Sequence, residues 1–111
     1  MPDGRTIVAQ PFLHCLAASW NPILAAKYGY AIGEEARYRE KDVLLGPGVN
    51  IYRTPLNGRN FEYMGEDPYL ASELCVPYIQ GVQKNGVAAC VKHYALNNQE
   101  LWRGHIDVQL S

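Results

Sequence analysis

Charged and polar side chains are concentrated in two loops, and each loop directly follows a short apolar run. The first loop follows residues 43–45 and the second follows residues 87–91. Long, charged loops that hang from buried strands are more often binding or catalytic sites than connectors. The candidate site residues are therefore the side chains that these loops carry: Arg53, Arg59, Glu62, Glu66, Asp67, Lys92, His93, Asn97, Asn98, Gln99, Glu100 and Arg103.

This combination of arginine, lysine, histidine, asparagine and carboxylate suits a ligand that is covered in hydroxyl groups. Each sugar hydroxyl both donates and accepts hydrogen bonds, so charged donors and acceptors can hold it. Hydrogen bonds to such hydroxyls assist glycoside hydrolysis when they strengthen in the transition state. Nucleotide binding is not expected, because Gly46-Pro47-Gly48 does not continue into a dinucleotide-binding pattern and the chain has no Walker lysine.

Length and charge exclude other partners. The chain has 111 residues, 48% of them hydrophobic, and a formal net charge of -1, which fits one globular domain. Ten basic residues are scattered among 11 acidic ones, so no basic face for nucleic acid is predicted. We expect neither a signal peptide nor a membrane span, because the first ten residues lack a leader pattern and no apolar stretch is long enough.

The cysteines predict neither a disulfide framework nor a structural zinc site. Cys15, Cys75 and Cys90 are odd in number, lie among apolar neighbours and form no CxxC pair, which predicts reduced, buried thiols. Metal-ligand spacing is also missing, so no metal and no other cofactor is expected from the available histidines and thiols: His14, Cys15, Cys90, His93 and His105.

Start signals and apolar spacing predict two helices. Asn21-Pro22 is a capping residue followed by proline at the first helical position, and helical spacing of apolar residues predicts a helix over 22–40. Asp67-Pro68 repeats the signal, and this second helix stops at Asn85-Gly86. Pro77 falls inside the second helix, where we expect a kink.

Four segments are predicted as strands: residues 13–19, 42–45, 87–91 and 105–110. The run 87–91 has the composition of a parallel strand covered on both faces. Alternation of strands and helices favours a parallel α/β sheet with right-handed crossovers, in which ligands bind beyond the carboxyl ends of the strands. About three strand-helix units cannot close an eight-stranded barrel of about 250 residues. The prediction is a small open sheet or a part of something larger.

Four motifs follow one another in the chain: AASWNP, LGPGVNIYRTP, GRNFEYMGEDPYLA and YIQGVQKNGVAACVKHYALNNQE. In order and spacing they closely resemble the N-terminal barrel domain of family 3 glycoside hydrolases, in particular the β-glucosidase-like members. The resemblance implies that residues 1–111 are an incomplete N-terminal domain with an α/β fold, a partial (β/α)8 TIM-type barrel that cannot close alone. It also implies a retaining exo-glycosidase that acts on a β-glucoside or related oligosaccharide and requires no metal.

The resemblance also implies binding roles. Arg59, the Lys92-His93 pair and Arg103 are expected to hold hydroxyls of the sugar in the subsite where cleavage occurs. An Asp in a DGP-type motif near the start of the family's domain does the same. Asp3 is its expected remnant, although Asp3-Gly4-Arg5 differs from that motif at the third residue.

The motifs of this chain include no counterpart of the family's two catalytic residues. The nucleophile is an Asp, usually followed by Trp, well downstream of the Lys-His pair, and the acid/base is usually a Glu in a second domain. A retaining mechanism needs two such carboxyl groups about 5 to 5.5 Å apart. The expectation is a fragment that carries sugar-binding residues but no catalytic residue, and that needs the missing C-terminal part of the barrel and the second domain.

Other interpretations remain open. Lys92-His93 could simply end a strand, Arg59 could pair with Glu62 or Glu66, and Glu100 with Arg103. Two alternatives to the enzyme are a non-catalytic sugar-binding module and a truncated product without function, whose sheet edges would be exposed.

Overall fold

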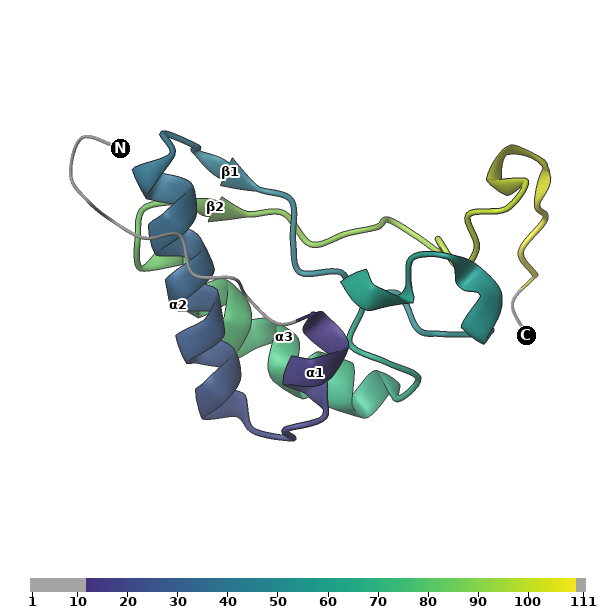
Figure 1. Cartoon of the computed structure of the whole chain (residues 1–111), viewed down its shortest axis with the longest axis horizontal. Helices are drawn as coiled ribbons and strands as arrows, with labels where there is room; N and C mark the ends of the chain where they lie inside the picture. The colour runs from purple at the N-terminus through teal and green to yellow at the C-terminus, as the bar shows by residue number, and fades with distance from the viewer. Residues whose placement is uncertain (1–11, 110–111) are drawn as a thin grey trace.

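The computed structural model describes residues 12–109. Its helices and strands are α1 (Leu13–Ala17), α2 (Pro22–Tyr38), β1 (Val43–Leu44), α3 (Pro68–Gln83) and β2 (Ala88–Ala89). The helices lie at one end of an elongated molecule, and the loops that follow the strands extend toward the other end (Figure 1). The radius of gyration is 14.9 Å, whereas a compact domain of about 100 residues has about 13 Å. The loops therefore project away from the helical part.

Both long helices begin at the predicted cap-plus-proline signals. The Asn21 side chain accepts hydrogen bonds from two backbone N–H groups of the first turn of α2, at 2.9 and 3.2 Å. The Asp67 side chain accepts one from the backbone N–H of Tyr69 at 2.8 Å. Helix α2 ends at Tyr38, close to the predicted end, and α3 continues through Pro77. The two helix predictions are confirmed, and the kink at Pro77 stays a prediction.

Replacing Asp67 with alanine is expected to destabilise the fold by about 1 kcal/mol, because the first turn of α3 loses its capping acceptor. Asp67→Asn keeps an acceptor oxygen at the same position and is the matched control. Urea denaturation followed by circular dichroism measures both variants. Equal losses for Asp67→Ala and Asp67→Asn would show that the cap hydrogen bond is not what stabilises this helix start.

Helices α2 and α3 pack closely because glycines lie in the contact between them. A Cβ atom added to Gly29 would come within 2.1 Å of the Tyr78 carbonyl oxygen. One added to Gly81 would come within 2.2 Å of the Ala26 carbonyl oxygen. These obstacles are backbone atoms, which cannot move aside as the end of a flexible side chain can. The helix crossing therefore requires glycine at both positions for reasons of space.

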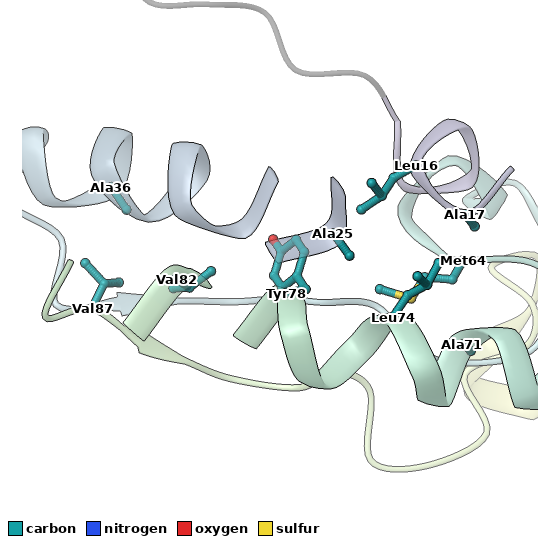
Figure 2. Close-up of a cluster of buried hydrophobic side chains, with 10 residues drawn as sticks. All are labelled: Leu16, Ala17, Ala25, Ala36, Met64, Ala71, Leu74, Tyr78, Val82 and Val87. Carbon is teal, nitrogen blue, oxygen red and sulfur yellow. The ribbon is translucent and has the colours of Figure 1, made fainter. Parts of the chain in front are cut away.

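The core lies where the three helices and β2 meet (Figure 2). Its centre is fully buried, with Ala25, Leu74 and Val82 all 0% exposed. Burial of large aliphatic side chains supplies most of the favourable free energy of such a cluster. The buried members are Leu16, Ala17, Ala25, Ala36, Met64, Ala71, Leu74, Tyr78, Val82 and Val87.

Strands β1 and β2 are parallel, as predicted, with Val43 opposite Ala88 and Leu44 opposite Ala89. Backbone pairing continues past both strands, because the backbone N–H of Lys92 donates to the Pro47 carbonyl at 3.0 Å. The segments that follow β1 and β2 therefore run in the same direction toward the projecting loops (Figure 1). This arrangement confirms that the two polar loops start at the same end of the sheet.

The strand predicted at residues 13–19 is wrong, because Leu13–Ala17 forms helix α1. Leu16 and Ala17 are buried, whereas His14 and Cys15 are exposed on the other side of the helix. A short apolar run fits either a buried strand or one face of a helix, so its pattern alone does not decide between them.

The strand predicted at residues 105–110 is also wrong over the residues that the structure describes. Arg103–His105 forms a 3₁₀ turn, η3, and residues 106–109 carry no strand assignment. An alternating sequence becomes a strand only where a neighbour pairs with it. Within residues 12–109 the sheet consists of β1 and β2.

The predicted burial of the cysteines and of the last apolar run is only partly right. All three cysteines are free thiols, but Cys15 and Cys90 are exposed and Cys75 is partly buried. Cys90 follows Ala89, which packs against the core, so the alternation of a strand directs Cys90 to the opposite face. Within residues 12–109 nothing covers that face, where Val43 is 54% and Leu45 70% exposed. The run 87–91 is therefore covered on one face instead of two.

Candidate functional site

Glu62 brings two of the predicted site residues together. Its Oε1 atom contacts the Arg59 guanidinium, and its Oε2 atom accepts a hydrogen bond from Lys92 Nζ at 2.6 Å. The Glu62 side chain is 11% exposed, the Lys92 side chain 26% and the Arg59 side chain 47%. One largely buried carboxylate is therefore the counterion of two cations. Its hydrogen bond with Lys92 is charge-assisted, and such bonds are stronger than ion pairs at an open surface.

Local structure sets the position of each partner in this Arg59–Glu62–Lys92 cluster. Arg59 precedes the 3₁₀ turn η2 (Asn60–Glu62), and three-residue spacing in such a turn places Arg59 and Glu62 on one side. The Arg59 guanidinium also lies 5.0 Å from the centroid of the Phe61 ring, a favourable cation–π contact. Gly48 pairs in parallel with both Tyr63 and Lys92, so it joins the turn to the second loop.

Asparagine and tyrosine side chains hold the loop that carries this cluster. The Asn57 side chain is buried and donates to Asn60 Oδ1 at 2.7 Å, and Asn60 Nδ2 donates to the Thr54 carbonyl at 3.1 Å. The Tyr52 hydroxyl donates to the Tyr63 carbonyl at 3.0 Å. Asn57 and Asn60 are not among the site residues that the sequence predicts. The turn signal around Asn57-Gly58 was available, but nothing local indicated which groups these amides would reach.

His93 is held on both its backbone and its ring. Its backbone N–H donates to Asn50 Oδ1 at 2.7 Å, and its Nδ1 atom lies 2.8 Å from the Tyr63 hydroxyl and 3.2 Å from the Asn97 amide nitrogen. Tyr63 is 1% exposed, so it is a core residue and not a surface on which a sugar ring could stack. The Nε2 atom of His93 has no hydrogen bond within residues 12–109.

The surroundings change the acid–base properties of these groups. Burial lowers the pKa of Lys92, and the neighbouring Arg59 guanidinium lowers it further. The Glu62 carboxylate acts in the opposite direction, because it favours the charged ammonium. Burial and the Lys92 ammonium also lower the pKa of His93 below its usual value near 6.5. The lowered pKa favours the neutral imidazole, which suits a neutral, hydroxyl-rich ligand.

Arg103 lies on the same side of the molecule as His93, although it does not contact the Arg59–Glu62–Lys92 cluster. Its guanidinium donates to Glu100 Oε2 at 3.2 Å, and the backbone N–H of Glu100 donates to the Asn57 carbonyl at 3.0 Å. Arg103 and His93 line one hollow of about 600 Å³. The structure therefore brings four of the predicted residues to one side, whereas Asp3 lies outside the described residues.

In residues 12–109, no three His, Cys, Asp or Glu side chains come together as metal ligands. None of the helices in this range combines the length and apolar character needed to cross a bilayer.

Known proteins are similar to nearly the whole chain. The model of the glycosyl hydrolase family 3 N terminal domain matches residues 3–110. Beta-glucosidase BoGH3A of Bacteroides ovatus is 96% identical over 103 residues, which are 93% of this chain and 14% of that protein. Thermostable beta-glucosidase B of Acetivibrio thermocellus is 55% identical over 92 residues, 83% of this chain and 12% of that protein. The chain thus spans only a small part of the length of these relatives.

Solved structures of beta-glucosidases also match this chain over most of its length. Beta-glucosidase 3B from Thermotoga neapolitana, in complex with alpha-D-glucose, matches with a TM-score of 0.80 and 51% identity, over 83% of this chain and 13% of that one. DesR, a beta-glucosidase from Streptomyces venezuelae in complex with D-glucose, matches with a TM-score of 0.84 and 39% identity, over 90% of this chain and 13% of that one. On sequence and structure together, this chain belongs to glycosyl hydrolase family 3 and corresponds to part of its N terminal domain.

Proposed function

We propose that this chain is part of the N-terminal barrel domain of a retaining, exo-acting β-glucosidase that hydrolyses terminal non-reducing β-D-glucosyl residues. The observation that carries the proposal is the Arg59–Glu62–Lys92 cluster beside His93, beyond the carboxyl ends of two parallel strands. Ligand sites of parallel α/β folds lie at this end of the sheet. Further support comes from relatives named beta-glucosidases and from structural neighbours solved with glucose.

In this proposal the cationic and imidazole groups hold the sugar through its hydroxyl oxygens. The Lys92 ammonium has three donors and gives one to Glu62, so two remain for a ligand. The Arg59 guanidinium carries five N–H donors, more than its contact with Glu62 can use. The Nε2 atom of His93 and the Arg103 guanidinium complete the set, and Asp3 is proposed as a further contact from the start of the chain.

The same proposal assigns the two catalytic carboxyl groups to the rest of the protein. A retaining mechanism needs one carboxylate to attack the sugar and one carboxylic acid to protonate the leaving group. Glu62 and Glu100 are each engaged by cations, namely Arg59 and Lys92 for Glu62 and Arg103 for Glu100. They are therefore proposed as counterions, while the C-terminal part of the barrel and a second domain supply the catalytic pair.

The 111-residue chain alone is expected to show no turnover of an aryl β-glucoside, since it holds no catalytic carboxyl in this proposal. A protein extended to the length of the relatives is expected to hydrolyse the β-glucoside and to leave the α-glucoside control intact. Steady-state assays of both purified proteins test this. Hydrolysis by the short chain that is abolished by mutating one of its own carboxylates would overturn the proposed division of roles.

A further inference from the structure

The Glu62 carboxylate has a separate cation on each oxygen, and this arrangement goes beyond an ordinary ion pair. Oε1 faces Arg59 of its own turn, while Oε2 reaches Lys92, thirty residues away in sequence. Removal of Glu62 would leave the largely buried Lys92 ammonium and the half-exposed Arg59 guanidinium without the carboxylate between them. Like charges at short range disfavour the charged form of whichever group can lose a proton. Here that group is Lys92, because an arginine guanidinium does not deprotonate in proteins.

We propose that Glu62 is a positioning residue that keeps Lys92 charged and fixes the Lys92 and Arg59 donors relative to each other for the sugar. The inference rests on the proposed function, in which both cations contact sugar hydroxyls. Glu62 itself does not touch the sugar in this proposal, because each of its oxygens faces a cation and its side chain is only 11% exposed.

The charged and titratable groups around Lys92 decide the sign of the expected pH effect. They are Glu62 at 2.6 Å, the Arg59 guanidinium, and His93, which follows Lys92 directly in the chain. Burial and Arg59 lower the pKa of Lys92, and the Glu62 carboxylate, an opposite charge at 2.6 Å, acts against this lowering. In Glu62→Gln the opposing charge is gone, so the pKa falls further and the ammonium loses its proton at lower pH. Activity that depends on the ammonium should then decline earlier as the pH rises.

The test measures kcat/KM for an aryl β-glucoside against pH in the full-length protein that contains this segment. The quantity of interest is the ratio of the Glu62→Gln value to the wild-type value at each pH, because ionisations that both proteins share cancel in it. Loss of an opposite charge at this distance shifts a pKa by about 1 to 3 units. We expect this ratio to fall from neutral to alkaline pH. The loss of activity at alkaline pH that depends on Lys92 should occur about 1 to 3 pH units lower in Glu62→Gln than in wild type.

Two further variants separate charge from structure. In the Lys92→Arg background, Glu62→Gln should lower kcat/KM without any alkaline shift, because the guanidinium stays charged. Glu62→Asp keeps the negative charge on a shorter side chain and should keep the alkaline limb of the wild type while losing activity. If circular dichroism shows that Glu62→Gln does not fold, Glu62→Asp and Glu62→Ser replace it. The alkaline limb of the kcat/KM profile should then stay in place in Glu62→Asp and move to lower pH in Glu62→Ser.

Each outcome decides the inference. A constant Glu62→Gln ratio across pH, or an alkaline shift that persists in the Lys92→Arg background, would overturn the role of Glu62. The sugar-binding role of Lys92 fails separately, if Lys92→Ala leaves kcat/KM unchanged, and the proposed function itself fails if the full-length wild type does not hydrolyse the β-glucoside. A strong effect of Lys92→Ala with no pH shift in Glu62→Gln would therefore reject the positioning role and leave the sugar-binding role of Lys92 intact.

Discussion

Lys92→Ala, made in the protein that contains this segment, is expected to lower kcat/KM for an aryl β-glucoside by about 100-fold or more. A hydrogen bond from a charged donor contributes about 1.5 to 3 kcal/mol, and removal of one partner of a buried charge pair costs about 2 to 5 kcal/mol. Both apply here, because Lys92→Ala removes donors to the sugar and leaves Oε2 of Glu62, a residue with a side chain only 11% exposed, without its cation. About 3 kcal/mol corresponds to about a hundredfold change in rate.

Steady-state kinetics of wild type, Lys92→Ala and Lys84→Ala measure this effect. Lys84 is an exposed lysine directly after the last residue of α3 and is not a partner in the ion pairs of the cluster, so its removal controls for the loss of a positive charge. Thermal denaturation of each variant separates loss of the site from loss of the fold. A Lys92→Ala enzyme with wild-type kcat/KM would remove Lys92 from the substrate-binding site.

Gly81→Ala is expected to destabilise the fold by about 3 kcal/mol or more. The new Cβ atom would lie 2.2 Å from the Ala26 carbonyl oxygen and 2.7 Å from the Tyr30 backbone nitrogen. Overpacking costs about 1 to 3 kcal/mol where side chains can shift, and here the neighbours are backbone atoms of α2. At an open helical position the same change would stabilise by about 1 kcal/mol, so the sign of the effect is diagnostic.

Urea denaturation followed by circular dichroism gives the free energy of unfolding for this variant. Gly104→Ala is the matched control, since a Cβ atom there meets nothing within 4 Å, and its effect should stay within about 0.5 kcal/mol. A Gly81→Ala protein as stable as wild type would mean that α2 and α3 are farther apart than the structure shows.

Local signals in the sequence predict the framework of this fold. The capping side chains Asn21 and Asp67 and the prolines after them fix both helix starts, because a cap involves only residues of the first turn. The ion pairs Arg59–Glu62 and Glu100–Arg103 could also be predicted from the sequence as alternatives to sugar contact, since each joins residues three apart. In the structure both pairs form, and a contact with sugar remains a proposal for both arginines.

Interactions between distant segments could not be predicted in the same way. The bond from Lys92 to Glu62 and the contact of His93 with Tyr63 each join residues thirty apart in sequence, and they exist only because β1 and β2 pair. The errors at residues 13–19 and 105–110 have a related cause. Whether a short apolar segment becomes helix or strand depends on the neighbour that it packs against, and no local pattern contains that neighbour.

The shared carboxylate of Glu62 has a consequence for selectivity between sugars. Arg59 and Lys92 each direct one donor at the same small group, so the directions of their remaining donors are fixed relative to each other. Epimeric hexoses carry equal numbers of hydroxyls but differ in whether one of them is axial or equatorial. A rigid pair of donors discriminates between such isomers through angle, whereas two independently mobile cations would adapt to either. In the proposed enzyme, loosening of this pair should therefore broaden the range of accepted epimers before it abolishes hydrolysis of the preferred one.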